Sequence, residues 1–139
     1  DNIYVKVSGV NADNEIDIVA PTINLTGKVN GVMEYTATLT QSGSSAPVET
    51  ILTNNTGETF TWTRGSTGEY VATCSGSILT ANKTSLVVGQ TNTGTSNIFI
   101  TSIHRTSTTT VGVYTMDAIG VSPVDDVLNE TTVTIKIYP

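Results

Sequence analysis

Few side chains of this chain could carry chemistry. His104 is the only histidine and Cys74 the only cysteine, and no H-E-x-x-H or G-x-S-x-G pattern is present. A Ser-His-Asp triad would need His104, which lies in a plain alternating stretch, so we expect it to be a surface or strand histidine. The lone Cys74 excludes an internal disulfide, and its alternating surroundings favour a small core hydrophobe over a reactive thiol. We therefore predict that the chain is not an enzyme.

Two acidic segments are candidates for binding a hard cation such as calcium. Asp13, Glu15 and Asp17 place carboxylates at alternate positions, as a calcium loop does, but the glycine and the final glutamate of an EF-hand loop are missing. Asp125 and Asp126 form the second candidate. For both segments we favour the simpler interpretation, a solvated acidic turn. The sequence thus assigns no catalytic residue, no metal ligand and no cofactor.

The overall composition narrows the class of protein. The chain has 139 residues and a net charge of −6, and only 13% of its residues are charged, against about 25% in average proteins. The acidic balance argues against a nucleic-acid partner, and no apolar run is long enough to insert into a membrane. The length fits a single domain over residues 1–139. No signal peptide is evident, and the chain begins at Asp1 rather than Met, as a trimmed or excised fragment would.

The elements that position these side chains read as strands. Threonine, valine and isoleucine outweigh the helix formers, and Ser, Asn and Gly mark frequent turns. We predict an all-β domain, an antiparallel β-sandwich or jelly roll of about eight to ten short strands, with a closed barrel as the second choice. Besides the two hairpins discussed next, we expect strands at 3–7, 15–20, 50–53, 84–88, 97–105, 106–116 and 131–138.

The segment that contains the only tryptophan predicts a β-hairpin over residues 60–74. Side-chain parity requires Phe60 and Trp62 to share one buried face with Ala72 and Cys74, which pairs residue 60 with 74 and 62 with 72. We expect a five-residue loop, 65–69, in which Gly68 takes a positive φ. Arg64 then lies beside Tyr70 at the tip, where its guanidinium could stack on the ring.

An earlier hairpin is predicted by the same argument. Leu25 would pair with Tyr35, and Ile23 with Ala37, across a three-residue loop of 29–31 that places Gly31 in the left-handed region.

Two further segments are long, small and polar. Residues 41–46 and 89–96 are rich in Ser, Thr, Asn and Gly, which indicates either adaptable recognition loops on a rigid scaffold or simple spacers.

Several short stretches carry a family resemblance: Thr61-Trp62-Thr63-Arg64, Gly68-Glu69-Tyr70, Leu79-Thr80-Ala81-Asn82-Lys83-Thr84, Leu128-Asn129-Glu130-Thr131-Thr132 and Ile137-Tyr138-Pro139. The chain resembles β-rich virion surface domains encoded by phages and prophages of Bacteroidota-type bacteria, which are similar to pieces of tail or head fibres and spikes. The resemblance covers residues 54–139 better than the first fifty, and no catalytic residue belongs to it.

The resemblance implies a non-enzymatic virion structural protein, a fibre or spike head or a surface decoration domain. Such a domain would be exposed on the virion, form a homotrimer, contact other virion proteins and attach to a host glycan or protein. Two alternatives stay open. One is a monomeric secreted bacterial adhesin or carbohydrate-binding module that binds through an exposed aromatic such as Tyr4 or Tyr114. The other is a calcium-stabilised domain of a larger depolymerase.

Overall fold

The computed structural model describes residues 31–90, 98–118 and 122–139. Tyr4, the strands predicted at 3–7 and 15–20, and the acidic residues Asp13, Glu15 and Asp17 lie outside this range. The described residues form strands β1 (Met33–Thr40), β2 (Val48–Asn54), β3 (Phe60–Ser66), β4 (Glu69–Cys74), β5 (Thr84–Val88), β6 (Phe99–Arg105), β7 (Thr110–Asp117) and β8 (Thr131–Ile137).

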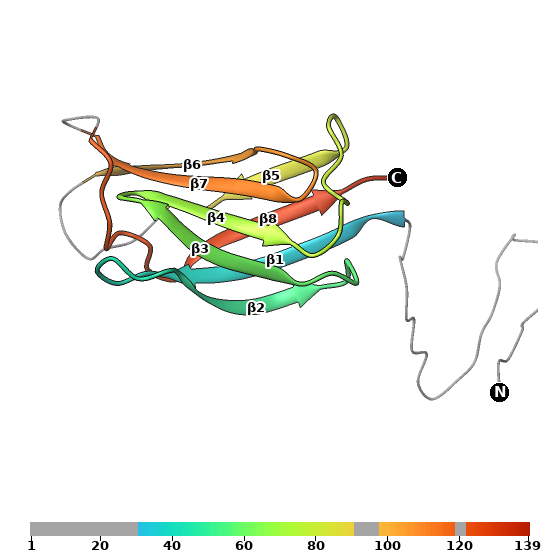
Figure 1. Ribbon diagram of the computed structural model, residues 1–139, viewed down its shortest axis with the longest axis horizontal. Coiled ribbons are helices and arrows are strands. Elements are labelled where there is room, and N and C mark those ends of the chain that lie inside the picture. Colours follow the sequence, from blue (N-terminus) through green and yellow to red (C-terminus); the bar gives the residue numbers. More distant parts are fainter. Residues whose placement is uncertain (1–30, 91–97, 119–121) are drawn as a thin grey trace, which may run out of the picture.

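The strands form two antiparallel sheets that pack face to face, as Figure 1 shows. One sheet has the order β2-β1-β8-β5 and the other the order β3-β4-β7-β6. The predicted fold class, an all-β sandwich of short strands, is confirmed. The hairpins β1–β2, β3–β4 and β6–β7 stay within one sheet, whereas the remaining connections cross between the sheets. In the part of the chain that the structure describes, no helix is long and apolar enough to span a membrane.

The core lies between the sheets and follows the period of two that strands impose. Every second residue of β1 is buried, and the same alternation recurs in β8. The inward side chains of β1, β3, β4, β7 and β8 that form the core are Met33, Tyr35, Ala37, Leu39, Phe60, Trp62, Tyr70, Ala72, Cys74, Val111, Val113, Val133, Ile135 and Ile137.

The β3–β4 hairpin has the predicted register. Phe60 pairs with Cys74 and Trp62 with Ala72, and all four side chains are buried. Cys74 is therefore the core hydrophobe that its position predicted, and burial raises the pKa of its thiol. The Trp62 ring nitrogen donates a hydrogen bond of 3.0 Å to the Tyr35 hydroxyl, so the one polar atom of this indole is satisfied inside the core.

The tip of this hairpin differs from the prediction in its length. Ser66 pairs with Glu69 after a bulge at Gly65, so the turn is shorter than the expected five-residue loop. The bulge adds one residue to β3, which keeps the side-chain parity that a longer loop was invoked to provide. Gly68 has the predicted positive φ, 67°.

The predicted pairing of Leu25 with Tyr35 and of Ile23 with Ala37 is wrong. Tyr35 pairs with Asn54 of β2 on one side and with Ile135 of β8 on the other, so both edges of β1 are occupied. Parity restricts which residues can face each other, but it cannot choose between competing partner strands. Ile23 and Leu25 lie outside the described residues, while Gly31 does have the expected positive φ, 73°.

The two ends of the sandwich differ in what they carry. We call one of them the loop end. It holds the β1–β2 loop, the β3–β4 turn and the segment 122–130 between β7 and β8 (Figure 1). At the opposite end, a Cβ atom on Gly31 would lie 3.2 Å from Cγ of Pro139, so residue 31 meets the last residue there. Gly31, the first residue that the structure describes, therefore lies at the end away from these three connections.

Candidate functional site

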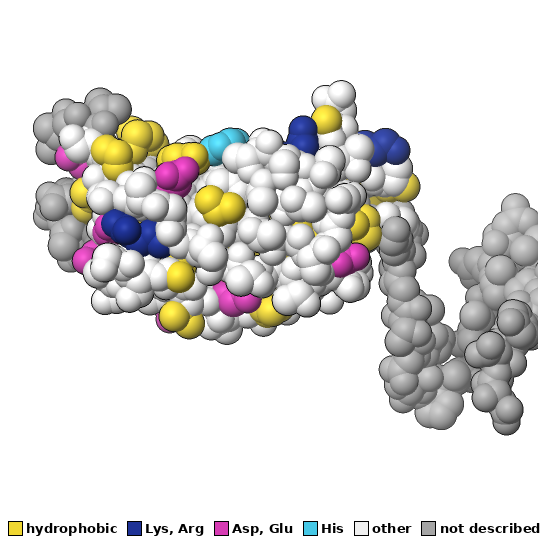
Figure 2. All heavy atoms as spheres, viewed as in Figure 1, with side chains coloured by type: hydrophobic (Ala, Val, Ile, Leu, Met, Phe, Trp, Pro, Cys, Tyr) yellow, Lys and Arg dark blue, Asp and Glu magenta, His cyan; other side chains and the backbone are white. Residues whose placement is uncertain are grey.

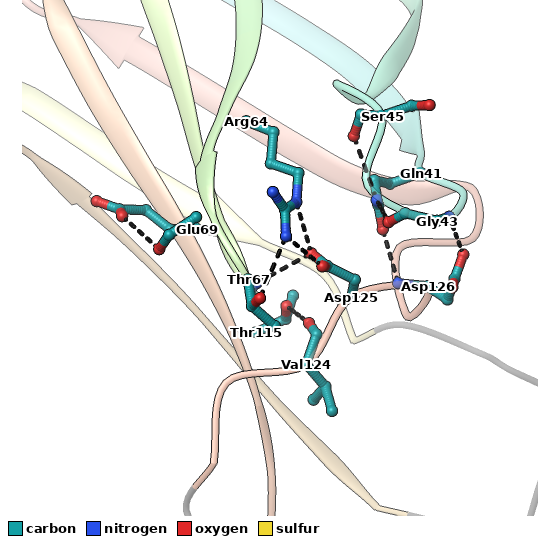
Figure 3. A network of polar contacts seen from close by, with 12 residues as sticks. Gln41, Gly43, Ser45, Arg64, Thr67, Glu69, Thr115, Val124, Asp125 and Asp126 are labelled. Atoms are coloured by element: carbon teal, nitrogen blue, oxygen red, sulfur yellow. Dashed lines mark hydrogen bonds and ion pairs between the residues drawn. The ribbon is translucent and has the colours of Figure 1, made fainter.

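The loop end is organised around one carboxylate, that of Asp125. Arg64 binds it through two nitrogens, with Nε 3.1 Å from Oδ1 and an η-nitrogen 2.6 Å from Oδ2. The backbone N–H of Gly68 donates to Oδ1 at 3.0 Å, and the Tyr70 hydroxyl lies at the same distance. Figure 3 shows how Arg64 and Asp125 face one another between the hairpin tip and the β7–β8 segment. Two segments that are distant in sequence are thereby joined.

The electrostatics of this cluster follow from its donors. The Arg64 guanidinium, helped by Gly68 and Tyr70, lowers the pKa of Asp125 to about 2, although partial burial opposes this shift. Burial, followed by the hydrogen bond to Asp125, raises the pKa of the Tyr70 hydroxyl. Asp125 is therefore an anion with its oxygens occupied, which suits it to hold structure together rather than to act as a base or nucleophile.

A second set of bonds fastens the β1–β2 loop to the same segment. Gln41 is buried, and its Oε1 accepts the backbone N–H of Asp126 at 2.7 Å and lies 3.0 Å from the Tyr70 hydroxyl. Its amide nitrogen donates to the carbonyl oxygens of Gly43, at 2.5 Å, and of Ser45, at 3.2 Å. Asp126 in turn accepts the backbone N–H of Gly43. The β1–β2 loop and Asp126 thus exchange hydrogen bonds across the loop end, since each of the two donates a backbone N–H to the other (Figure 3).

The turn of the β3–β4 hairpin is wedged against β7. A Cβ atom on Gly68 would lie 2.4 Å from the carbonyl oxygen of Thr115 and 2.8 Å from the backbone nitrogen of Val124, so only glycine fits there. The Gly68 carbonyl accepts the N–H of Thr115 at 2.8 Å, and the Thr115 carbonyl accepts the N–H of Val124 at 3.1 Å. We refer to the contacts of Gln41, Arg64, Gly68, Asp125 and Asp126 together as the Asp125 clasp.

An exposed apolar row lies beside the clasp on the outer face of the second sheet. Ile100 of β6 pairs with Met116 of β7, which bridges to Pro123, so the three side chains share one face of the sheet. Ile98, two residues before Ile100, falls on that face as well. Ile98 is 71% exposed and Ile100 is 45% exposed. We call Ile98, Ile100, Met116 and Pro123 the apolar patch, and Figure 2 shows hydrophobic side chains gathered at this end of β6 and β7.

Two rings lie next to this patch on the same face. His104 of β6 stacks on Tyr114 of β7, with ring centroids 4.9 Å apart and an angle of 23° between the planes. Both rings also pack over Gly112, where an added Cβ atom would lie 3.0 Å from His104. The Tyr114 hydroxyl donates to Glu69 at 3.0 Å, and this bond raises its pKa. His104 is exposed and Tyr114 half-buried, so His104 offers the more accessible ring of the pair.

Comparisons with protein families, with curated proteins and with solved structures give no match to this chain.

The predictions made for individual residues agree with the structure to different extents. Asp125 and Asp126 lie in a loop, as expected, but Asp125 is neither freely solvated nor open to a cation, because its oxygens accept bonds from Arg64 and Gly68. Within residues 31–90, 98–118 and 122–139, no group of three or more His, Cys, Asp or Glu side chains could hold a metal ion. Arg64 does lie opposite Tyr70 at the hairpin tip, as predicted, and the partner that the structure shows for its guanidinium is Asp125.

The structure tests the predictions for the two candidate recognition loops only in part. Residues 42–46 of the β1–β2 loop are exposed, as predicted, whereas Gln41 at its base is buried. Most of the second loop, residues 91–97, lies outside the described range.

Sequence reasoning missed Gln41 and the apolar patch. Gln41 reads as one more polar loop residue, because its bonding partners include Asp126, which is 85 positions away. Ile98, Phe99 and Ile100 are all apolar, so alternation could not show which face of β6 points outward. Pro123 predicted a break in regular secondary structure, but nothing in the sequence predicted that this residue lies beside β7.

Proposed function

We propose that this chain is a non-enzymatic surface domain of a phage or prophage virion. It belongs to a fibre or spike head, or decorates the surface, and attaches to a host glycan or protein through its loop end. One observation carries the proposal: an exposed row of large apolar side chains lies directly beside the Asp125 clasp. The family resemblance supplies the virion context, and we propose that the domain works as a homotrimer with other virion proteins.

The clasp supports recognition because it fixes the loops before a partner arrives. Three connections from different parts of the chain are held by charged and backbone hydrogen bonds around Asp125 and Gln41. A surface that is already ordered loses less conformational entropy on binding, so more of the contact energy appears as affinity. The position also fits attachment, since Gly31 and the C-terminal residue Pro139 lie together at the opposite end.

The apolar patch supports the same role energetically. Ile98 and Ile100 are exposed to water although they are among the most apolar side chains, and covering them releases free energy in proportion to the area buried. Large exposed apolar side chains at one end of a rigid scaffold are typical of contact surfaces.

The test is binding of the labelled full-length chain to intact cells from a panel of Bacteroidota isolates. We expect Ile100→Asp to weaken binding about tenfold or more, because a carboxylate in the centre of an apolar contact is desolvated without a partner. The matched control is Ile51→Asp on β2, since Ile51 is exposed to a similar extent, 52%, but lies in the other sheet. Equal binding of folded Ile100→Asp and wild type, or no binding to any isolate, would overturn the proposal.

A monomeric adhesin or carbohydrate-binding module is the second candidate. The stack of His104 on Tyr114 favours it, because an exposed ring on a flat sheet can pack against the face of a sugar. Glycan-array binding by a monomeric chain, lost in His104→Ala and kept in Ile100→Asp, would favour this function over virion attachment.

A further inference from the structure

One edge of the β2-β1-β8-β5 sheet is open. β2 is the last strand of this sheet, so among the described residues only β1 pairs with it. All residues of β2 except Glu49 are exposed, and three of them are large and apolar: Val48, Ile51 and Leu52. A bulge beside Leu52 distorts this edge, but the strand contains neither proline nor lysine, which commonly protect an edge from pairing. In the described part of the chain, the backbone groups of β2 that point away from β1 thus have no strand to pair with.

Ile51 points toward the inner side of the sheet and yet stays exposed. It pairs with Ala37, whose side chain is fully buried, and directly paired residues share one face of a sheet. Nevertheless, Ile51 keeps 52% of its exposure. At the other edge of this sheet, the inward side chains Leu86 and Val88 of β5 pack against the core, and β5 contacts β6 of the second sheet. Among the described elements, the sandwich is thus closed on the β5 side and open on the β2 side.

The sequence contains an alternating segment that is left without its predicted partner. Residues 22–26 read Thr-Ile-Asn-Leu-Thr, so in a strand Ile23 and Leu25 would share one face and the polar side chains the other. β1 cannot bind this segment, because β2 and β8 occupy both of its edges. The nearest open edge of the same sheet is that of β2, one strand further out.

The position of Gly31 sets how far this segment can reach. Gly31 lies two residues before β1, and the N–H of Asn55 donates to the carbonyl oxygen of Glu34 at 3.0 Å, so the end of β2 lies beside the start of β1. An extended chain from residue 26 to residue 31 spans about 17 Å, and a strand added beside β2 would lie two strand spacings, about 10 Å, from β1. Residue 26 can therefore lie beside the end of β2, with the rest of the segment along its length. Because the segment must finish at Gly31, it runs parallel to β2.

We propose that residues 22–26 form a further strand of this sheet by pairing with the open edge of β2, and that Ile23 and Leu25 cover Ile51. The occupant is the chain's own segment, since only residues 27–30 lie between it and Gly31 and closing so short a connection loses little entropy. Its polar side chains then continue the outer face of β1 and β8, where most outward residues are threonine. The pairing removes an exposed apolar edge to which other chains could add a strand.

Hydrogen–deuterium exchange of the full-length chain, read by mass spectrometry in peptides that cover residues 22–26 and 48–54, tests the pairing. In the wild type we expect residues 22–26 to exchange at least about tenfold more slowly than an unstructured peptide of the same sequence. Leu25→Asp should release the segment, because the new carboxylate would be desolvated beside Ile51. Exchange in residues 48–54 should then become about tenfold faster.

Val5→Asp is the matched control, because it places the same charge in the strand predicted at residues 3–7 and should leave both peptides unchanged. Unchanged exchange in β4 and β7 shows that each variant is folded.

Four results would overturn the inference. The first is exchange of residues 22–26 at the rate of the unstructured peptide. The second is release of residues 22–26 by Leu25→Asp without faster exchange in 48–54, because the partner would then not be β2. The third is an equal effect of Val5→Asp, which would assign the edge to residues 3–7. The fourth is protection that is lost on dilution from about 200 to about 2 µM, because the segment would then come from a second copy.

The inference does not depend on the proposed virion role. Attachment is assigned to the apolar patch of the other sheet, so Ile51→Asp remains a control for cell binding although it should also loosen residues 22–26. Failure of either experiment therefore leaves the other proposal standing.

Discussion

Replacing Asp125 by asparagine tests whether one carboxylate holds the loop end together. Asparagine has nearly the same shape and can still accept from Gly68 and Tyr70 through its oxygen. Its NH₂ group, however, replaces the oxygen that lies 2.6 Å from Arg64, so two donors face each other and the guanidinium loses its counter-charge. The change thus removes the ion pair while keeping the volume of the side chain.

The pKa of Asp125 gives the size of the effect. A carboxyl with a pKa of about 3.9 in the unfolded chain and about 2 in the folded protein contributes at most about 2.5 kcal/mol to the free energy of unfolding at pH 7. The side chain keeps 17% of its exposure, and solvent screening reduces the contribution to about 1.5–2 kcal/mol.

The same shift predicts a pH dependence with a definite sign. Because the folded pKa is the lower one, the contribution is complete above about pH 5 and is lost as the pH falls toward 2. About 1 kcal/mol should be gone by pH 3. Asp125→Asn has no carboxyl to protonate at this position, so the difference in stability between wild type and variant should shrink by that amount between pH 7 and pH 3.

Urea unfolding followed by tryptophan fluorescence measures both quantities, because Trp62 is the only tryptophan and lies in the core. Glu130→Gln is the matched control: it removes an exposed carboxylate from the same β7–β8 connection and should leave the free energy of unfolding nearly unchanged. The reasoning is refuted if Asp125→Asn is as stable as Glu130→Gln at pH 7, or if its deficit stays constant down to pH 3.

Three further outcomes are expected. Trp62→Ala should lower the free energy of unfolding by about 3–5 kcal/mol in urea titrations, because the indole is buried in the core, and a near-neutral result would place it on the surface. Gly68→Ala should lower the free energy of unfolding by at least about 2 kcal/mol, because the new methyl group meets Thr115. Gly57 also has a positive φ, 78° against 67° for Gly68, but lies in open space, so Gly57→Ala should cost only about 1 kcal/mol. Equal losses would contradict the tight contact at Gly68. Millimolar EDTA or added calcium should leave the melting temperature unchanged, because Arg64 and Gly68 occupy the oxygens of Asp125, and a shift on chelation would point to a cation elsewhere in the chain.

The sequence by itself determined the local features of this protein. Alternation placed the strands around residues 84–88 and 131–138, and parity gave the pairing of Phe60 with Cys74 across the β3–β4 hairpin. Such features can be predicted because side chains alternate between the two faces of a strand, and because a hairpin pairs segments that are close in sequence. The shared face of Trp62 and Ala72 follows from the same rule. The conformation of Gly68 was also predictable, since a tight turn between paired strands requires a positive φ.

The tertiary structure decided everything that depends on distant partners. Arg64 and Asp125 are 61 positions apart, and only the packing of the hairpin tip under the β7–β8 segment brings them within 2.6 Å. Likewise, β1 pairs with β2 and β8 rather than with a preceding strand, because threonine-rich strands offer many equivalent registers and the buried faces select among them only when both sheets assemble. The outward direction of Ile100 was set in the same way, by which face of β6 the opposite sheet covers.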